Sequence, residues 1–335
     1  MFIQIIFLIL LSISLIYIQS KYSFLIDKPD NQEHKLEHNK NVPLSGGLYF
    51  FIAILVDTLL FKNSQQNLLL NMFIFLFLIL GIYSDLKINF SPKLRLFFQA
   101  MLVILTIIFL DVKINKTNIF FLDIFIDNNI FNLIFTSICI LVIINGSNFC
   151  DGINCNMIGY YLIVALAIFL IELHLPTTLI SVEKIIIIFS LFYILNLFQK
   201  SFLGDNGVYV ISIFMSIYVI TFINLNTSVS PLLALNLLWY PAFENLFTII
   251  RRFFASKSVQ IADRSHLHIL IFKKIFDKKR VILSNSLTGL ILNLYMFAGI
   301  FLSINFYHNS KALILILVTN IVIYILGYYF LLFKK

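Results

Sequence analysis

Long apolar runs separated by short polar loops constrain this chain more than any other feature. A helix that crosses the hydrocarbon core of a bilayer needs about 17–25 mostly apolar residues. The chain is 60% hydrophobic and only 12% charged, whereas soluble domains average about 45–50% and about 25%. The runs lie near residues 1–20, 47–61, 67–83, 94–110, 129–146, 157–173, 184–199, 207–225, 231–250, 284–305 and 312–332. The sequence therefore predicts one all-α, polytopic domain over residues 1–335 with about eleven transmembrane helices, or ten if two runs merge.

The positions of Lys and Arg predict how these helices are oriented, because cytoplasmic loops are enriched in both. Of the 24 basic residues, 19 fall in one set of alternate loops and at the carboxyl terminus. We therefore expect the amino terminus outside and the carboxyl terminus in the cytoplasm. No Lys or Arg precedes Lys21 and no small-residue cleavage site follows the first run, so we expect it to remain as a helix rather than a cleaved signal peptide.

Composition also restricts the classes of function. The net charge is +8, but the basic residues are scattered between apolar runs, so we expect no nucleic-acid partner. The three cysteines show no CxxC or Cys/His spacing of a zinc site, and we expect reduced thiols. Asp57, toward the outer end of the second run, is the main charge inside a span. This scarcity argues against an ion-coupled transporter, whose site is expected near the bilayer midplane.

The polar residues that suggest chemistry lie in the predicted cytoplasmic loops near 21–46, 84–93, 145–156, 199–206 and 251–283. In the third loop a polar residue recurs every three positions, and on a helix or a 3₁₀ turn these side chains would share one face. Such a stripe suits a hydrogen-bonding ligand or a metal held by Asp151, although capping and turn roles are an alternative. The stripe consists of Asn145, Asn148, Asp151 and Asn154.

Two further acidic residues stand in short cytoplasmic loops. Asp85 lies in a segment with Lys93 and, taken alone, fits a solvated loop as well as a site. Asp205 lies between Gly204 and Gly207, where backbone can approach a ligand closely. A carboxylate there suits Mg²⁺ beside phosphate oxygens, and a turn with a helix N-cap is the alternative.

The longest cytoplasmic segment, residues 241–280, carries acid, Arg and His residues together. We expect its arginines to meet phosphate or anionic lipid headgroups, and its histidines to donate to an anion because no third metal ligand stands nearby. For Glu244 the alternative is an ion pair within one helix, since Arg251 follows it by two helical turns. The candidates are Glu244, Arg252, Arg264, His266 and His268. Across the loops, the combination suits a divalent metal and a multiply charged phosphate substrate.

At this point the chain resembles a known family, the polyprenyl-phosphate N-acetylhexosamine-1-phosphate transferases of glycosyltransferase family 4. The resemblance runs from about residue 27 to 269, follows the family's order and is closest to the branch that uses UDP-N-acetylglucosamine. It is carried by Pro43-Leu44-Ser45-Gly46-Gly47, residues 81–99, residues 145–154, Asn196 with Phe202-Leu203-Gly204-Asp205-Asn206-Gly207, residues 241–252, and Asp263-Arg264-Ser265-His266-Leu267-His268.

The resemblance implies transfer of a sugar 1-phosphate from a UDP-sugar to polyprenyl phosphate, with release of UMP. It implies Mg²⁺, with Mn²⁺ as an alternative, on Asp205 and Asp151, and Asp85 near the acceptor phosphate as a third catalytic residue. It implies substrate contacts from Asn145, Asn148, Asn154, Asn196, Lys93, Glu244, Arg252, Arg264, His266 and His268. The expected setting is a bacterial cytoplasmic membrane with the site on its inner face, membrane lipids as partners, a homodimer as an option, and a product for surface polysaccharide such as O-antigen.

Four departures from the family pattern qualify this expectation. Ser84 stands where the first of two aspartates is usual, Asn154 where a second acid is usual, Glu244 where Asp is usual, and Ile269 where a third His is usual. Two alternatives therefore remain: an inactive homologue with a scaffold role, and a transporter of lipid-linked sugars. Loss of the first aspartate need not abolish turnover, because a phosphate monoester with a pKa near about 6 is largely dianionic at neutral pH.

Overall fold

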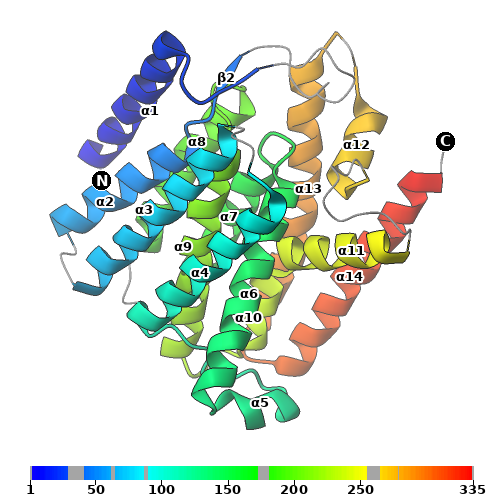
Figure 1. Ribbon diagram of the computed structural model, residues 1–335. Helices are drawn as coiled ribbons and strands as arrows, with labels where there is room; N and C mark the ends of the chain where they lie inside the picture. Colours follow the sequence, from blue (N-terminus) through cyan, green and yellow to red (C-terminus); the bar gives the residue numbers. More distant parts are fainter. Residues whose placement is uncertain are drawn as a thin grey trace.

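The protein is an all-helical bundle in the computed structural model (Figure 1). The structure describes residues 2–28, 41–61, 65–86, 90–172, 181–254, 265–277 and 279–333. The helices are α1 Phe2–Tyr22, α2 Gly46–Phe61, α3 Gln65–Asp85, α4 Pro92–Leu110, α5 Phe120–Ile126, α6 Asn129–Cys150, α7 Asn156–Glu172, α8 Val182–Leu197, α9 Gly204–Leu225, α10 Leu232–Leu237, α11 Trp239–Phe254, α12 Leu267–Ile275, α13 Val281–Asn305 and α14 Ser310–Phe333. Two short strands, β1 Ile26–Asp27 and β2 Val42–Pro43, pair antiparallel.

Each predicted apolar run overlaps a helix, but fewer helices are long enough to span. Within the described ranges, seven are long and apolar enough to cross a membrane: α1, α3, α4, α6, α9, α13 and α14. The helices α2, α7 and α8 have only 16 or 17 residues, which at about 1.5 Å per residue falls short of a hydrocarbon core of about 30 Å. The multi-pass helical fold agrees with the sequence, whereas the number eleven and the orientation stay predictions.

The run at 231–250 differs from the single helix predicted there. It breaks at Leu238 into α10 and α11, and α11 lies across the direction of the long helices (Figure 1). Pro241 explains the break, because it has no N–H to donate to the carbonyl four residues earlier and clashes with it. That carbonyl, on Leu237, instead accepts a hydrogen bond from the Tyr160 hydroxyl at 2.6 Å.

Helix α11 buries its polar face and exposes its apolar face, which is the reverse of a surface helix in a soluble protein. The residues at helical spacing Pro241, Glu244, Asn245, Thr248 and Arg252 are buried, while the opposite face is apolar and exposed, with Phe253 at 77% and Phe254 at 80%. A polar face turned inward and an apolar face turned outward match a lipid environment.

Helix α9 forms the centre of the bundle and sets where the site lies. It is largely buried, with 78% of its membrane-span window inside the protein, and it packs against α2, α3 and α6. Its amino-terminal residues are therefore held in the middle of one end of the bundle, near β1 and β2 (Figure 1). Asp57 of α2, the charge predicted inside a span, is buried and forms an ion pair of 2.7 Å with Lys184 of α8.

Candidate active site

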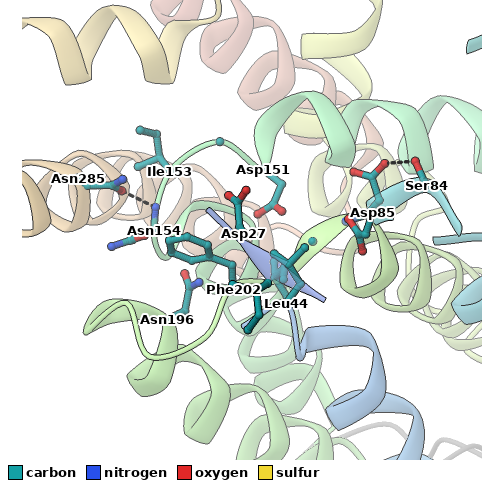
Figure 2. A pocket seen from close by; sticks show the side chains of 15 residues that line it. Asp27, Leu44, Ser84, Asp85, Asp151, Ile153, Asn154, Asn196, Phe202 and Asn285 are labelled. Carbon is teal, nitrogen blue, oxygen red and sulfur yellow. Dashed lines mark hydrogen bonds between the residues drawn. The ribbon is translucent and has the colours of Figure 1, made fainter. Parts of the chain in front are cut away.

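A cavity of about 350 Å³ lies at the end of the bundle where α9 begins. Four carboxylates from four separate segments line it: Asp27 of β1, Asp85 of α3, Asp151 after α6, and Asp205 of α9. Figure 2 shows the side chains of Asp27, Asp85 and Asp151 around this space. Carboxylates gathered in one cavity repel one another, so the site favours a cation as occupant.

Asp205 is held by donors from three other helices. Its Oδ2 accepts from the Ser84 hydroxyl at 2.5 Å and pairs with Arg95 Nη1 at 3.3 Å. Its Oδ1 accepts from Asn148 Nδ2 at 2.7 Å, and Tyr209 lies one turn further along α9, with its hydroxyl 3.4 Å from Oδ2. This shell of donors fixes the carboxylate and stabilises its negative charge.

Asp85 lines the cavity, and its carboxylate also holds the start of α9. Its Oδ1 accepts the backbone N–H of Asp205 at 2.8 Å, and its Oδ2 accepts the N–H of Asn206 at 3.0 Å and the Asn206 side-chain amide at 2.5 Å. The first N–H groups of a helix have no partners within it. Leu203, which precedes α9, provides no side-chain cap. Asp85 therefore caps α9 from the neighbouring helix α3.

Glycines permit this cross-helix cap. Gly204 has φ +68°, in the left-handed region that favours glycine. A Cβ on Gly81 of α3 would overlap the backbone of Asn206, so only glycine lets α3 approach close enough for Asp85 to reach the first turn of α9. The segment Gly204-Asp205-Asn206-Gly207 thus sets the backbone geometry at the start of α9 as well as the position of Asp205.

Asp151 is the carboxylate in the cavity without a donor. No hydrogen bond or ion pair links it to any residue that the structure describes. Burial raises the pKa of the Asp151 carboxyl well above its usual range, and the nearby Asp205 and Asp85 raise it further. A buried acid beside two others is costly when charged, and a bound cation would remove that cost. The residues present therefore fit a divalent metal, although no group of three ligands is preformed among the described residues.

The predicted polar stripe is only partly on a helix, because α6 ends at Cys150. Asn148 faces Asp205, but the Asn145 amide donates to the Leu141 carbonyl of its own helix at 2.9 Å and does not line the cavity. The expectation that Asn145 contacts substrate is not supported by this geometry, since a half-buried amide on a helix can donate to a carbonyl of the preceding turn.

Asn154 and Asn196 line the cavity, yet their amides hold the surrounding loops together. Asn154 donates its backbone N–H to Asn285 Oδ1 at 2.6 Å and its side-chain amide to Ser286 at 3.1 Å. Asn196 accepts from the Cys155 N–H at 2.5 Å and donates to the Ser201 carbonyl at 3.0 Å. At position 154 an amide supplies a donor that the carboxylate usual in the family lacks.

A network of buried polar side chains joins α11, α12 and α14 beside the segment 145–156. His266 Nδ1 lies 2.8 Å from Glu244 Oε1, and the Tyr324 hydroxyl donates to Glu244 Oε2. The His268 ring stacks on His266 with centroids 5.5 Å apart, and burial lowers the pKa of His268 well below its usual range. Glu244 therefore pairs with His266, and the Arg251 guanidinium lies over the ring of Tyr328.

Comparison with known proteins agrees with this arrangement. Residues 67–223 match the sequence profile of glycosyl transferase family 4. This match supports the family that the motifs resemble. It is 27% identical, over 72% of its length and 68% of the relative's, to a probable undecaprenyl-phosphate N-acetylglucosaminyl 1-phosphate transferase of Bacillus subtilis. It is 24% identical, over 81% and 80%, to the undecaprenyl-phosphate alpha-N-acetylglucosaminyl 1-phosphate transferase of Thermotoga maritima. The resemblance noted from the motifs is confirmed.

Other predicted site residues lie outside the cavity. Lys93 is exposed at the start of α4, and Arg95, two residues later, is the cation that reaches Asp205. Arg252 is buried on α11 and does not line the cavity. Arg264 falls outside the described residues, as does Asp263 of the same motif.

Sequence reasoning missed several residues of this site. Asp27 and Asn285 line the cavity, and Tyr324 reaches Glu244. The signal for Asp27 was present, since it is an acid within the predicted cytoplasmic loop near 21–46. No pattern pointed to Asn285 or Tyr324, because both lie within apolar helices expected to serve only as anchors.

Proposed function

We propose that the protein transfers a sugar 1-phosphate, that of an N-acetylhexosamine, from a UDP-sugar to undecaprenyl phosphate. The observation that carries the proposal is the convergence of four carboxylates in one cavity at the end of a membrane bundle. The names of both relatives supply the acceptor lipid and the sugar class. The product would begin a lipid-linked surface polysaccharide, such as O-antigen.

The reaction breaks one phosphoanhydride bond and forms another. An oxygen of the acceptor phosphate attacks the sugar-bearing phosphorus of the donor, and the bond from that phosphorus to the bridging oxygen of UMP breaks. The products are UMP and a polyprenyl diphosphate linked to the sugar. The acceptor phosphate is largely dianionic at neutral pH, with a pKa of about 6, so the attack does not require a base at position 84 to remove a proton from it.

Mg²⁺ would be held by Asp151 and Asp205, and when bound it would neutralise charge on the diphosphate. Asp151 suits this role because it is half-buried and no described residue donates a hydrogen bond to it. Ser84, Arg95 and Asn148 orient the Asp205 carboxylate. Asp85 holds the start of α9 and so places Asp205 at the cavity wall.

The site would face the cytoplasm of a bacterium, where UDP-sugars are made. The proposal rests on the sequence, in which 19 of 24 Lys and Arg residues fall in the loops on that side.

The test is release of UMP from UDP-N-acetylglucosamine by detergent-solubilised protein with undecaprenyl phosphate and Mg²⁺. We expect UMP to require the acceptor, to disappear when a chelator removes the metal, and to fall at least about a hundredfold in Asp205→Asn. The matched control is Asp111→Asn, the same change at an exposed aspartate whose side chain is 86% accessible.

The result that would overturn the proposal is UMP release in Asp205→Asn equal to that of the unmodified protein. No release from any donor in a panel of UDP-sugars would favour the scaffold or the transporter instead.

A further inference from the structure

A second hollow lies beside the active-site cavity, on the membrane-facing side of the bundle. It has a volume of about 580 Å³ and runs between the end of α8, at Leu197 and Phe198, and the first three turns of α13. We call it the α8–α13 groove. None of the carboxylates of the active site lines it.

The wall of the groove is apolar and open to the outside. Leu283, Leu287 and Leu290 line it and are spaced four and three residues apart, so they share one face of α13. They are 47%, 38% and 40% exposed, and they belong to the membrane span Val281–Asn305. Ser286 also lines the groove, but its hydroxyl donates to the Leu197 carbonyl at 2.8 Å. The wall therefore suits hydrocarbon.

The mouth of the groove is cationic. Lys279 and Arg280 line it and directly precede the first residue of the span, which places their charges at the boundary between membrane and water. The one carboxylate recorded beside them is that of Asp277, which accepts the backbone N–H of Lys279 at 2.8 Å. No ion pair joins Lys279 or Arg280 to another described residue.

We propose that the α8–α13 groove binds an anionic phospholipid. Lys279 and Arg280 would hold its phosphate, and the leucine face of α13 would cover the first carbons of one acyl chain. Charge complementarity at the mouth and hydrocarbon on the wall are the two requirements of such a ligand. A free phosphate would use only the mouth and leave the apolar wall uncovered.

The groove and the active-site cavity share a wall, which gives the bound lipid a way to influence catalysis. Asn285 faces the cavity and the next residue, Ser286, faces the groove. Both hold Asn154 through hydrogen bonds of 2.6 and 3.1 Å. A lipid packed against α13 would therefore support the loop that carries Asp151.

The experiment measures lipids retained by the full chain. The protein is reconstituted in nanodiscs that contain phosphatidylcholine and phosphatidylglycerol in equal amounts, and native mass spectrometry counts the lipids that remain bound after release. We expect preferential retention of phosphatidylglycerol by the unmodified chain and a severalfold loss in the double variant Lys279→Ala/Arg280→Ala. The matched control, Lys273→Ala/Lys274→Ala, removes two charges from α12 outside the groove and should retain the lipid.

A second pair of variants tests the apolar wall. Leu287→Trp fills the groove and should also reduce retention severalfold, whereas Leu294→Trp, at a residue 71% exposed on the same helix outside the groove, should not. Equal retention of the two lipids by the unmodified chain would overturn the proposal without any variant. So would equal losses in a groove variant and its control.

Discussion

Asp85 uses both of its carboxylate oxygens on the first turn of a neighbouring helix. A side chain that caps a helix normally belongs to the residue just before it, but here the cap comes from α3, across a contact that Gly81 makes close enough. The acid that sequence motifs place near a substrate thus also positions Asp205. Its distance in sequence from α9 is why no local pattern could reveal this.

Replacing Asp85 by Ala should impair both stability and turnover. Loss of a helix cap costs about 0.5–2 kcal/mol, and the freed start of α9 would no longer hold Asp205 in place, so UMP release should fall at least about tenfold. Asp85→Asn keeps one acceptor oxygen and should be intermediate. Thermal unfolding and the initial rate of UMP release measure the two effects.

Asn128→Ala is the control for this change. Asn128 caps α6 by accepting two N–H groups at 3.0 Å, and it does not line the active-site cavity. It should lower stability by a similar amount and leave turnover largely intact. If Asp85→Ala and Asn128→Ala reduced turnover equally, Asp85 would have no role beyond stability.

The thiol of Cys155 should be inert in the folded protein. Burial raises the pKa of Cys155 to about 12, and only the thiolate is nucleophilic, so at pH 8 the thiol stays protonated and unreactive. Peptide mapping after iodoacetamide should find Cys155 unmodified until the protein is unfolded in SDS. Modification in the folded state would show that the loop 151–155 opens to solvent.

At the same scale, the sequence identified most of the acids but not their neighbours. Asp85, Asp151 and Asp205 were predictable because an acid in a short loop of a membrane protein needs a partner or a ligand. Arg95 was not preferred over Lys93, because the two differ only in their position on α4, and which one faces Asp205 depends on how α4 packs.

Among the elements, α11 departs most from its apolar pattern. Hydropathy alone merged it with α10, since a membrane helix tolerates Pro when its neighbours satisfy the released carbonyl. Here the Tyr160 hydroxyl satisfies the Leu237 carbonyl. Because that donor comes from α7, the break depends on a tertiary contact that the sequence of residues 231–250 does not contain.

Tyr160→Phe should therefore destabilise the junction between α10 and α11. It leaves the buried Leu237 carbonyl without a donor, which costs about 1–3 kcal/mol. Thermal unfolding in detergent measures the change. Tyr161→Phe is the control, because the partner of its hydroxyl, Ser147, can rotate toward another acceptor. Equal losses in the two variants would argue that the Leu237 hydrogen bond has no special importance.

At the scale of the whole molecule, the active site depends on helices from both ends of the chain. The overall class, a multi-pass helical bundle, was predictable because apolar length and composition determine it. Participation of α13 and α14 was not, because Asn285 and Tyr324 look like ordinary polar positions in anchors until packing shows their contacts.

Tyr324→Phe tests this dependence. Without the hydroxyl, Glu244 loses a donor on the side facing α14, and the Glu244–His266 pair should be less well positioned. We expect UMP release to fall about tenfold. Tyr329→Phe, at a residue 45% exposed on the same helix, is the control. Full activity in Tyr324→Phe would mean that α14 contributes only packing to the protein and nothing to turnover.

The hydrogen bond between Tyr324 and Glu244 can form only late in the synthesis of the chain. Ribosomes deliver the helices of this chain to the membrane one after another, and the carboxylates of the cavity are all present once α9 has been inserted. The hydroxyl that secures Glu244 arrives only with the last helix. A nascent chain stalled before α14 would carry every acid of the site yet lack this support, so the enzyme matures only when synthesis is nearly complete.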